Sequence, residues 1–226
     1  MPLLILLIVG VAVLLGPMWW TRRTIARHSH ERDDFPGTGG EFARHLLDRL
    51  ELRDVGVEST ERGDHYDPAG RVVRLLPQHK DGKSLAAVVI AAHEVGHAMQ
   101  HASGYAPLDW RTRLASTAAT IQRLGAGMML LVPLIAVVTR SPVGSSITLL
   151  AGLATLGVGA LVHLVTLPVE WDASFRRALP ILESGYIGKQ DLPAARQLLT
   201  AAALTYVAGA LGALLNIWAW LRLIRR

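Results

Sequence analysis

Four long apolar runs alternate with two polar stretches along this chain of 226 residues. Apolar runs of about 20 residues are typical of helices that cross a lipid bilayer. The pattern therefore predicts about four transmembrane helices, with the polar stretches outside the bilayer. The apolar runs are residues 3–20, 125–139, 143–167 and 198–221, and the polar stretches are residues 21–123 and 168–197.

The order of these runs predicts five consecutive parts. An uncleaved N-terminal anchor comes first, because Arg22 and Arg23 follow the apolar run, whereas a cleaved signal peptide has its basic residues before it. A polar part, a transmembrane hairpin, a second polar part and a C-terminal transmembrane helix with a basic tail complete the chain. The predicted bounds are 1–20, 21–123, 124–167, 168–197 and 198–226.

The distribution of basic residues predicts the orientation. With four spans both polar parts lie on one side of the membrane, and they contain 19 of the 23 Lys and Arg residues. The positive-inside rule then favours the cytoplasmic side, although the basic tail Arg222, Arg225 and Arg226 favours the opposite one. Because the basic residues form no dense run, the net charge of +5 does not indicate nucleic-acid binding.

Local patterns predict a small α+β unit in the first polar stretch. Residues 40–52 have apolar side chains at helical spacing, and Thr38 with Glu41 matches the capping box that begins many helices. Two short strands and a second helix, which begins after Ser84, are predicted at residues 55–57, 71–76 and 85–101. Residues 72–76 of the second strand are a candidate edge strand that could bind a peptide backbone, and an ordinary packed strand is the alternative.

Composition narrows the class of protein further. Hydrophobic residues make up 51% of the chain and charged residues only 18%, which argues against disorder and against a purely soluble enzyme. The chain has no Cys, which excludes disulfides and thiolate metal sites. Any bound metal must therefore have His, Asp or Glu ligands.

One motif indicates chemistry, because residues 93–97 are His-Glu-Val-Gly-His, the H-E-x-x-H pattern of zinc metalloproteases. His93 and His97 lie one turn apart on the same helix face, so both imidazoles can reach one zinc ion. Glu94, next to the first ligand, can accept a proton from the attacking water and pass it to the leaving amine. The preceding apolar segment is typical of a buried helix, where ionisable groups without partners would be costly.

A third ligand has to come from elsewhere in the chain. His101 lies a further turn along the same face and cannot readily reach the same metal, so a role beside the ligands or at the helix end is the better interpretation. Glu170 is the stronger candidate, because residues 170–174 resemble the E-x-x-A-D pattern of gluzincins, with Ser174 where Asp is common. Glu183 remains the competing ligand.

Four further side chains are candidates for supporting roles. Ser174 or Asp172 could orient a zinc-binding histidine through a hydrogen bond. Tyr186 or Arg176 could stabilise the oxyanion that forms during amide hydrolysis.

The chain resembles the YugP-like neutral zinc metallopeptidases of bacterial membranes. The resemblance implies a membrane-anchored, gluzincin-like zinc peptidase with His93, His97 and Glu170 as ligands and Glu94 as catalytic base. The matching segments are Thr38-Gly39 with Ala43-Arg44, and residues 64–68 (DHYDP), 91–101 (AAHEVGHAMQH), 105–108 (YAPL), 169–174 (VEWDAS), 183–186 (ESGY) and 199–208 (LTAAALTYVA).

Pattern and resemblance together predict a mainly α membrane protein with about four transmembrane helices and a small α+β zincin-like unit. The predicted function is a membrane-embedded endopeptidase with one Zn²⁺ per chain, which hydrolyses peptide bonds through zinc-activated water and a Glu base. Expected partners are protein or peptide substrates and the lipid bilayer of a bacterial cell, and an oligomer or partner protein stays open. The alternative is a non-catalytic membrane scaffold or regulatory subunit in which four protein ligands close a structural zinc site.

Overall fold

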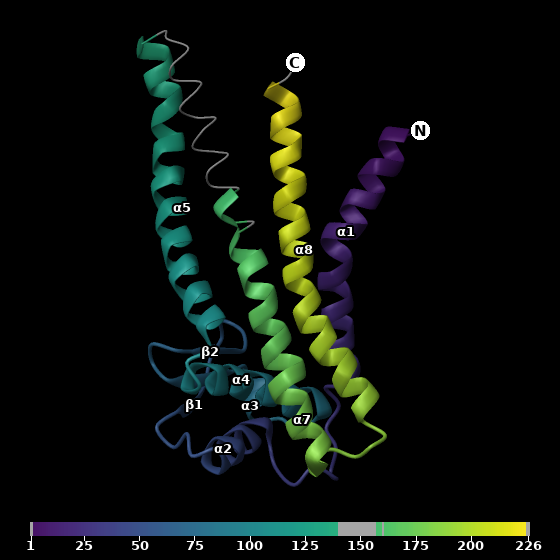
Figure 1. Cartoon of the computed structure of the whole chain (residues 1–226). Helices are drawn as coiled ribbons and strands as arrows, with labels where there is room; N and C mark the ends of the chain where they lie inside the picture. The colour runs from purple at the N-terminus through teal and green to yellow at the C-terminus, as the bar shows by residue number, and fades with distance from the viewer. Residues whose placement is uncertain (1, 140–156, 160, 225–226) are drawn as a thin grey trace. The chain divides into compact units, whose positions relative to one another are not determined.

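A computed structural model describes residues 2–139, 157–159 and 161–224, which are mainly helical with one small sheet (Figure 1). The chain divides into two compact units. One unit comprises Met1–Leu14, Trp110–Leu167 and Tyr206–Arg226, and the other comprises Leu15–Asp109 and Pro168–Thr205. The second, here called the sheet unit, contains the H-E-x-x-H motif.

The described elements follow one another along the chain, and residues 161–171 form a further helix. The labelled elements are α1 (Pro2–Arg27), α2 (Gly39–Arg49), β1 (Gly56–Ser59), β2 (His65–Asp67), β3 (Val72–Leu75), α3 (Pro77–Lys80), α4 (Leu85–Ala102), α5 (Ala106–Thr139), η1 (Asp172–Ala178), α7 (Leu179–Ile181), η2 (Leu182–Tyr186) and α8 (Leu192–Ile224).

The transmembrane part of the sequence prediction is wrong. Within the described ranges, no helix combines the length and the apolar character needed to cross a bilayer. The helices do not end where the apolar runs end: α1 continues to Arg27, and α5 joins residues 125–139 to the polar residues before them. Part of the predicted span at 143–167 lies outside the described residues. The cytoplasmic placement, which was counted across four spans, stays a prediction.

The predicted helices α2 and α4 are confirmed, and local signals set where they begin. The Thr38 side chain accepts a hydrogen bond from the Glu41 backbone, and the Glu41 carboxylate accepts one from the Thr38 backbone, which completes the capping box. Ser84 caps α4 in the same manner, by accepting a hydrogen bond from the Ala87 N–H.

The sheet has three strands in the order β1-β3-β2, with β1 parallel and β2 antiparallel to β3. The strands predicted near 55–57 and 71–76 correspond to β1 and β3, but the prediction that the latter is an edge strand is wrong. β3 pairs on both sides, and three of its four side chains are buried, so β1 and β2 form the edges. The three residues of β2 are too few to give an alternating pattern.

The segment that follows the third apolar run is a helix of changing width. Glu170 lies inside the helical residues 161–171, close to their C-terminal end. The helix is wider in η1 and η2, which α7 separates, and at the end of η1 the Leu179 N–H bonds to the Ser174 carbonyl five residues earlier. Such π-turns are rare and are frequently found at functional sites. Gly185, with a φ of 113°, adopts the left-handed conformation that ends the segment.

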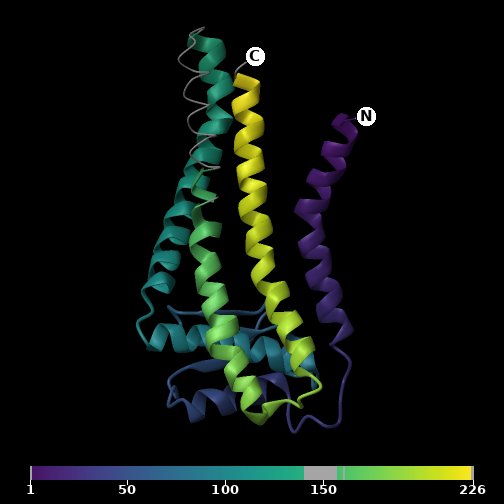
Figure 2. The same ribbon diagram turned by 45° about the vertical axis from the view of Figure 1, so that its right-hand side comes forward.

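Helix α4 is the central element of the sheet unit, since it packs against α2, η1 and the sheet. Figures 1 and 2 show α2 and α4 as adjacent layers. Leu47 of α2, Leu75 of β3, Val89 of α4 and Leu182 of η2 are fully buried in one shared core. Burial of each such side chain contributes about 1.5–3 kcal/mol. This core fixes α4 relative to the segment that follows Glu170.

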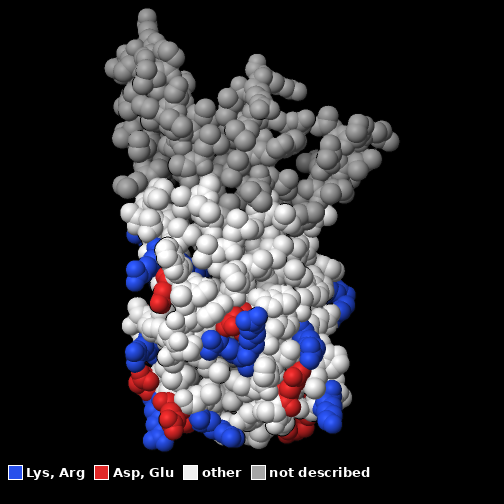
Figure 3. Space-filling model, viewed as in Figure 1, with Lys and Arg blue, Asp and Glu red and all other residues white. Residues whose placement is uncertain are grey.

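Charged side chains lie on the outside of the molecule with both signs interspersed, as the face in Figure 3 shows. Several form ion pairs, such as Arg32 with Asp191 at 2.7 Å and Arg74 with Asp67 at 2.6 Å. The Arg74 guanidinium holds the pKa of Asp67 below its usual range. The described part of this face therefore presents no patch of a single sign.

Candidate metal centre

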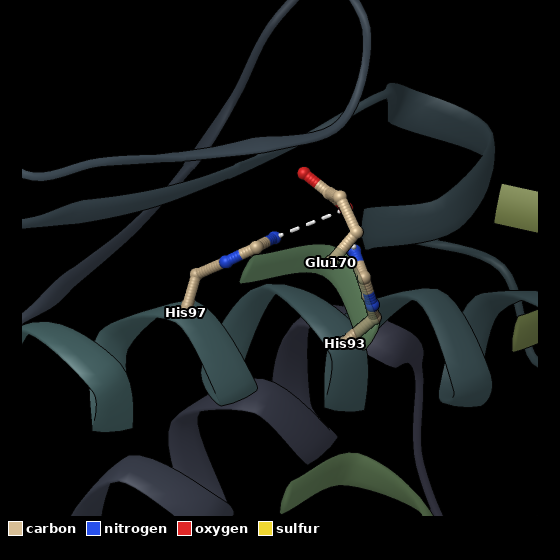
Figure 4. A group of neighbouring side chains, drawn as sticks. All are labelled: His93, His97 and Glu170. Carbon is tan, nitrogen blue, oxygen red and sulfur yellow. Dashed lines mark hydrogen bonds and ion pairs between the residues drawn. The ribbon is translucent and has the colours of Figure 1, made fainter. Parts of the chain in front are cut away.

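His93 and His97 lie on one face of α4, as their spacing predicts. Their ring centroids are 4.8 Å apart and the rings are nearly perpendicular, at 82°. Both side chains are buried. The Nε2 atoms of both rings face the same side of the helix, so the distal nitrogens are the ones presented to any shared ligand (Figure 4).

Glu170 reaches this face from the helix 161–171, which is 77 residues from His93 in sequence. Its Oε2 lies 3.2 Å from His93 Nε2 and 3.5 Å from His97 Nε2 (Figure 4). Candidate ligand atoms of all three residues are within 4.8 Å of one another. The structure therefore brings together the three residues that sequence and resemblance named as ligands.

The donor set fits zinc. Two imidazole nitrogens and one carboxylate oxygen are the ligands of many catalytic zinc sites, which leave a further position open. Burial favours the neutral form of Glu170, but the two histidines, chiefly His97, hold its pKa well below the usual range. An ionised carboxylate beside two imidazoles can serve as a metal ligand without first losing a proton.

Each histidine is also held at its other ring nitrogen. His93 Nδ1 is 3.1 Å from the Ser174 hydroxyl, and His97 Nδ1 is 2.9 Å from Gln100 Oε1. Hydrogen bonds of this kind orient zinc-binding histidines and select their tautomer. Ser174 thus occupies the position that the sequence suggested. Gln100 was missed, although its place three residues after His97 puts it on a neighbouring part of the same face.

Glu94 is buried beside the three candidate ligands, on the helix that packs against β2 and β3. The backbone of Tyr66 in the edge strand β2 lies close enough to lower the pKa of this carboxyl slightly. Burial raises the pKa of Glu94 to about 7, with smaller contributions from the negative charges of Glu170 and Asp64. The position of β2 beside α4 could not be predicted, since a strand of three residues is too short to show a periodic pattern.

Gly96 explains how the Glu170 helix comes so close to α4. A Cβ added to Gly96 would lie 2.7 Å from the backbone oxygen of Ala173, which is tighter than real Cβ contacts. The absence of a side chain at Gly96 therefore allows a direct approach of the backbone between Glu170 and Ser174.

The remaining candidate side chains have their described hydrogen bonds with residues other than the three candidate ligands. His101 Nδ1 is 2.8 Å from the Tyr66 hydroxyl, so His101 holds β2 against α4. The Tyr186 hydroxyl lies 3.1 Å from His45 and 3.2 Å from Arg49, both on α2. Its described contacts therefore give no support for a role at the oxyanion.

Glu183, the competing ligand, and Arg176, the other candidate for the oxyanion, are on the outside of the sheet unit. Glu183 is exposed and pairs with Arg196, so it is not brought to the two histidines. Arg176 is also exposed, and lies near enough to Asp172 to lower the pKa of that carboxyl. Asp172 itself accepts hydrogen bonds from Gln100 at 2.9 Å and Arg177 at 2.7 Å, and so acts on the histidines only through Gln100.

The three candidate ligands are compatible with the class of zinc peptidases, and comparison with known proteins shows the family. A family model described as "Putative neutral zinc metallopeptidase" matches residues 3–225, so the chain belongs to this zinc metallopeptidase family. A curated relative, the "Putative membrane protease YugP" of Bacillus subtilis (strain 168), is 36% identical over 216 residues. The match covers 90% of this chain and 89% of the relative. No solved structure matches the chain.

Proposed function

We propose that this member of the family is a gluzincin-type endopeptidase in which His93, His97 and Glu170 bind one zinc ion and Glu94 is the general base. The observation that supports it most is the convergence of two Nε2 atoms on one Glu170 oxygen, with the Glu94 carboxylate buried beside them. Zinc, when bound, supplies a Lewis acid that polarises the peptide carbonyl and acidifies water.

In this proposal, residues of the chain transfer the proton and orient the ligands. The Glu94 carboxylate accepts the proton of the attacking water and then donates it to the nitrogen of the leaving amine. The Tyr66 backbone of β2 lies beside this carboxylate. Ser174 and Gln100 hold the two imidazoles at their Nδ1 atoms, so that both Nε2 atoms stay directed toward Glu170.

The substrates of a peptidase are peptides or proteins, and we place the bound peptide along β2. This strand pairs with β3 on one side and is an edge of the sheet on the other. An extended peptide can bind such an edge through main-chain hydrogen bonds. The contact between Tyr66 and Glu94 puts this edge next to the proposed base, so the scissile bond would lie close to both.

We also propose that the protein associates with membranes, because the Bacillus subtilis relative is named a membrane protease. In the sheet unit Met18 and Trp19 on α1 are exposed, and the Arg23 guanidinium lies 5.3 Å from the Trp19 ring centroid. Exposed Trp beside Arg is typical of segments at a membrane surface. Co-sedimentation with lipid vesicles tests this association, and Trp19→Ser should weaken it.

Glu94→Gln tests the mechanism directly. The variant should keep one zinc ion per chain, because Glu94 is not one of the three ligands, and should lose roughly 10²–10⁴-fold in peptide hydrolysis. Zinc is measured by elemental analysis and hydrolysis with a quenched fluorescent peptide. Full activity in Glu94→Gln would refute the assigned role. The scaffold alternative predicts a fourth protein ligand, whereas the cluster in the described residues has three members.

A further inference from the structure

The side chain of Gln100 connects the two halves of the metal centre. It is fully buried, and it extends from α4 to the segment that contains Glu170. Its Oε1 lies 2.9 Å from His97 Nδ1, while its Nε2 lies 2.8 Å from the Val169 carbonyl and 2.9 Å from Asp172 Oδ1. Both the oxygen and the nitrogen of the Gln100 amide therefore have hydrogen-bond partners.

The partners determine which way the amide faces. The Val169 carbonyl can only accept hydrogen bonds, and so can an ionised Asp172 carboxylate, so the NH₂ group must face them. Arg177, which stays protonated in proteins, donates to the same Asp172 oxygen at 2.7 Å and keeps that carboxylate an acceptor. The opposite orientation of the amide would place two acceptors against its oxygen.

The orientation of the amide in turn determines the tautomer of His97. An amide oxygen only accepts, so Nδ1 of His97 has to carry the hydrogen, and the lone pair is left on Nε2. Nε2 is the atom that faces Glu170, at 3.5 Å. The Ser174 hydroxyl beside His93 can donate or accept and imposes no such choice.

The same network holds α4 and η1 together. Arg177 donates a hydrogen bond to the Ser103 hydroxyl at 3.2 Å and lies 5.6 Å from the centroid of the Tyr105 ring. These contacts tie the end of α4 and the residues after it to the helix that bears Asp172. Deleting the Gln100 amide would therefore affect both the histidine and the fit between the two helices.

We propose that Gln100, oriented by Asp172 and Arg177, is a positioning residue for the zinc site, which fixes the tautomer and direction of His97. This inference rests on the proposed function, because it assigns Gln100 a role toward the zinc that His93, His97 and Glu170 would bind. Residues that hold a metal ligand in this way typically alter metal affinity about 10- to 100-fold when they are replaced.

The test is equilibrium zinc binding, measured by competition with a chromophoric chelator on the full-length protein. Gln100→Met, which keeps the shape of the side chain, should weaken zinc binding about 10- to 100-fold. Asp172→Asn should weaken it less, because its own amide can still pair with Gln100 in one orientation. If the two residues act in series, the double variant should bind zinc about as weakly as Gln100→Met alone.

A matched control separates positioning from folding. Val55→Ala removes a buried side chain on the loop before β1 and should lower the unfolding temperature without changing zinc affinity. If folded Gln100→Met and Asp172→Asn bind zinc as tightly as the wild type, the role of Gln100 is overturned while the proposed function stands. Wild-type protein that binds no zinc would overturn the proposed function and this inference with it.

Discussion

Gly96→Ala is the sharpest test of how the metal centre is built. Helix propensity alone favours Ala over Gly inside a helix by about 0.5–1 kcal/mol. The structure predicts the opposite sign, since the new Cβ would meet the Ala173 oxygen at 2.7 Å and its carbonyl carbon at 3.4 Å. Because the obstacle is backbone, it cannot rotate away. Overpacking of this kind costs about 1–3 kcal/mol, so we expect net destabilisation of about 1–2 kcal/mol.

The effect on metal binding should exceed the effect on folding. Restoring ordinary contact requires the Ala173 backbone to move away from α4 by about 0.7 Å, from 2.7 Å to 3.4 Å. Ala173 lies between Glu170 and Ser174, so both would move relative to the histidines. Metal sites keep their ligand distances within about 0.2 Å. Zinc affinity should therefore fall by about tenfold or more.

Chelator competition and thermal unfolding of the metal-free protein measure the two effects. Gly16→Ala is the matched control, because it makes the same change inside helix α1 at a site with no atom within 4 Å of the new Cβ. That control should be neutral or slightly stabilising. The reasoning fails if Gly96→Ala is as stable as Gly16→Ala and binds zinc as tightly as the wild type.

Three further predictions follow from the same geometry. Glu170→Ala should lose most zinc binding and also the rise in unfolding temperature that zinc gives the wild type, and a retained rise would assign the third ligand elsewhere. Tyr66→Phe, which removes the hydrogen bond to His101, should lower stability by about 0.5–1.5 kcal/mol in denaturant titrations. Because Arg74 lowers the folded-state pKa of Asp67, this pair stabilises the fold above the unfolded pKa near 3.8, and the stabilisation is lost as pH falls through the lower folded value. Asp67→Asn should therefore unfold with a weaker dependence on acid pH, and an unchanged profile would contradict the assignment.

Much of the candidate metal centre could be predicted from the sequence, because residue spacing and helix caps are local signals. The spacing of His93 and His97 fixes their common face once α4 is a helix, and the caps at Thr38 and Ser84 fix where α2 and α4 begin. Local spacing could not identify Glu170, because it is 77 residues from His93. It was identified because residues 170–174 resemble the gluzincin pattern.

Other features could not be predicted because their causes are not local. The apolar runs suggested membrane spans, but hydropathy does not show where a helix ends, and no described helix meets the requirement for a span. Strand β2 exists because β3 pairs with it and α4 packs beside it, and its three residues show no pattern of their own. Tyr186 was one of two candidates for stabilising the oxyanion, and only the fold shows that its hydroxyl lies beside His45 and Arg49 of α2.

The sequence by itself determined which groups are available: a chain without Cys, with two histidines one turn apart and an acid beside the first, offers only nitrogen and oxygen atoms to a metal and places a carboxylate next to them. The tertiary structure decided how these groups are held. Gln100 meets Asp172 and His97 where Gly96 lets the Ala173 backbone approach α4, and Glu94 is buried where α4 packs against an edge strand. Such hydrogen bonds join residues far apart in sequence, so packing fixes them and no spacing in the chain can.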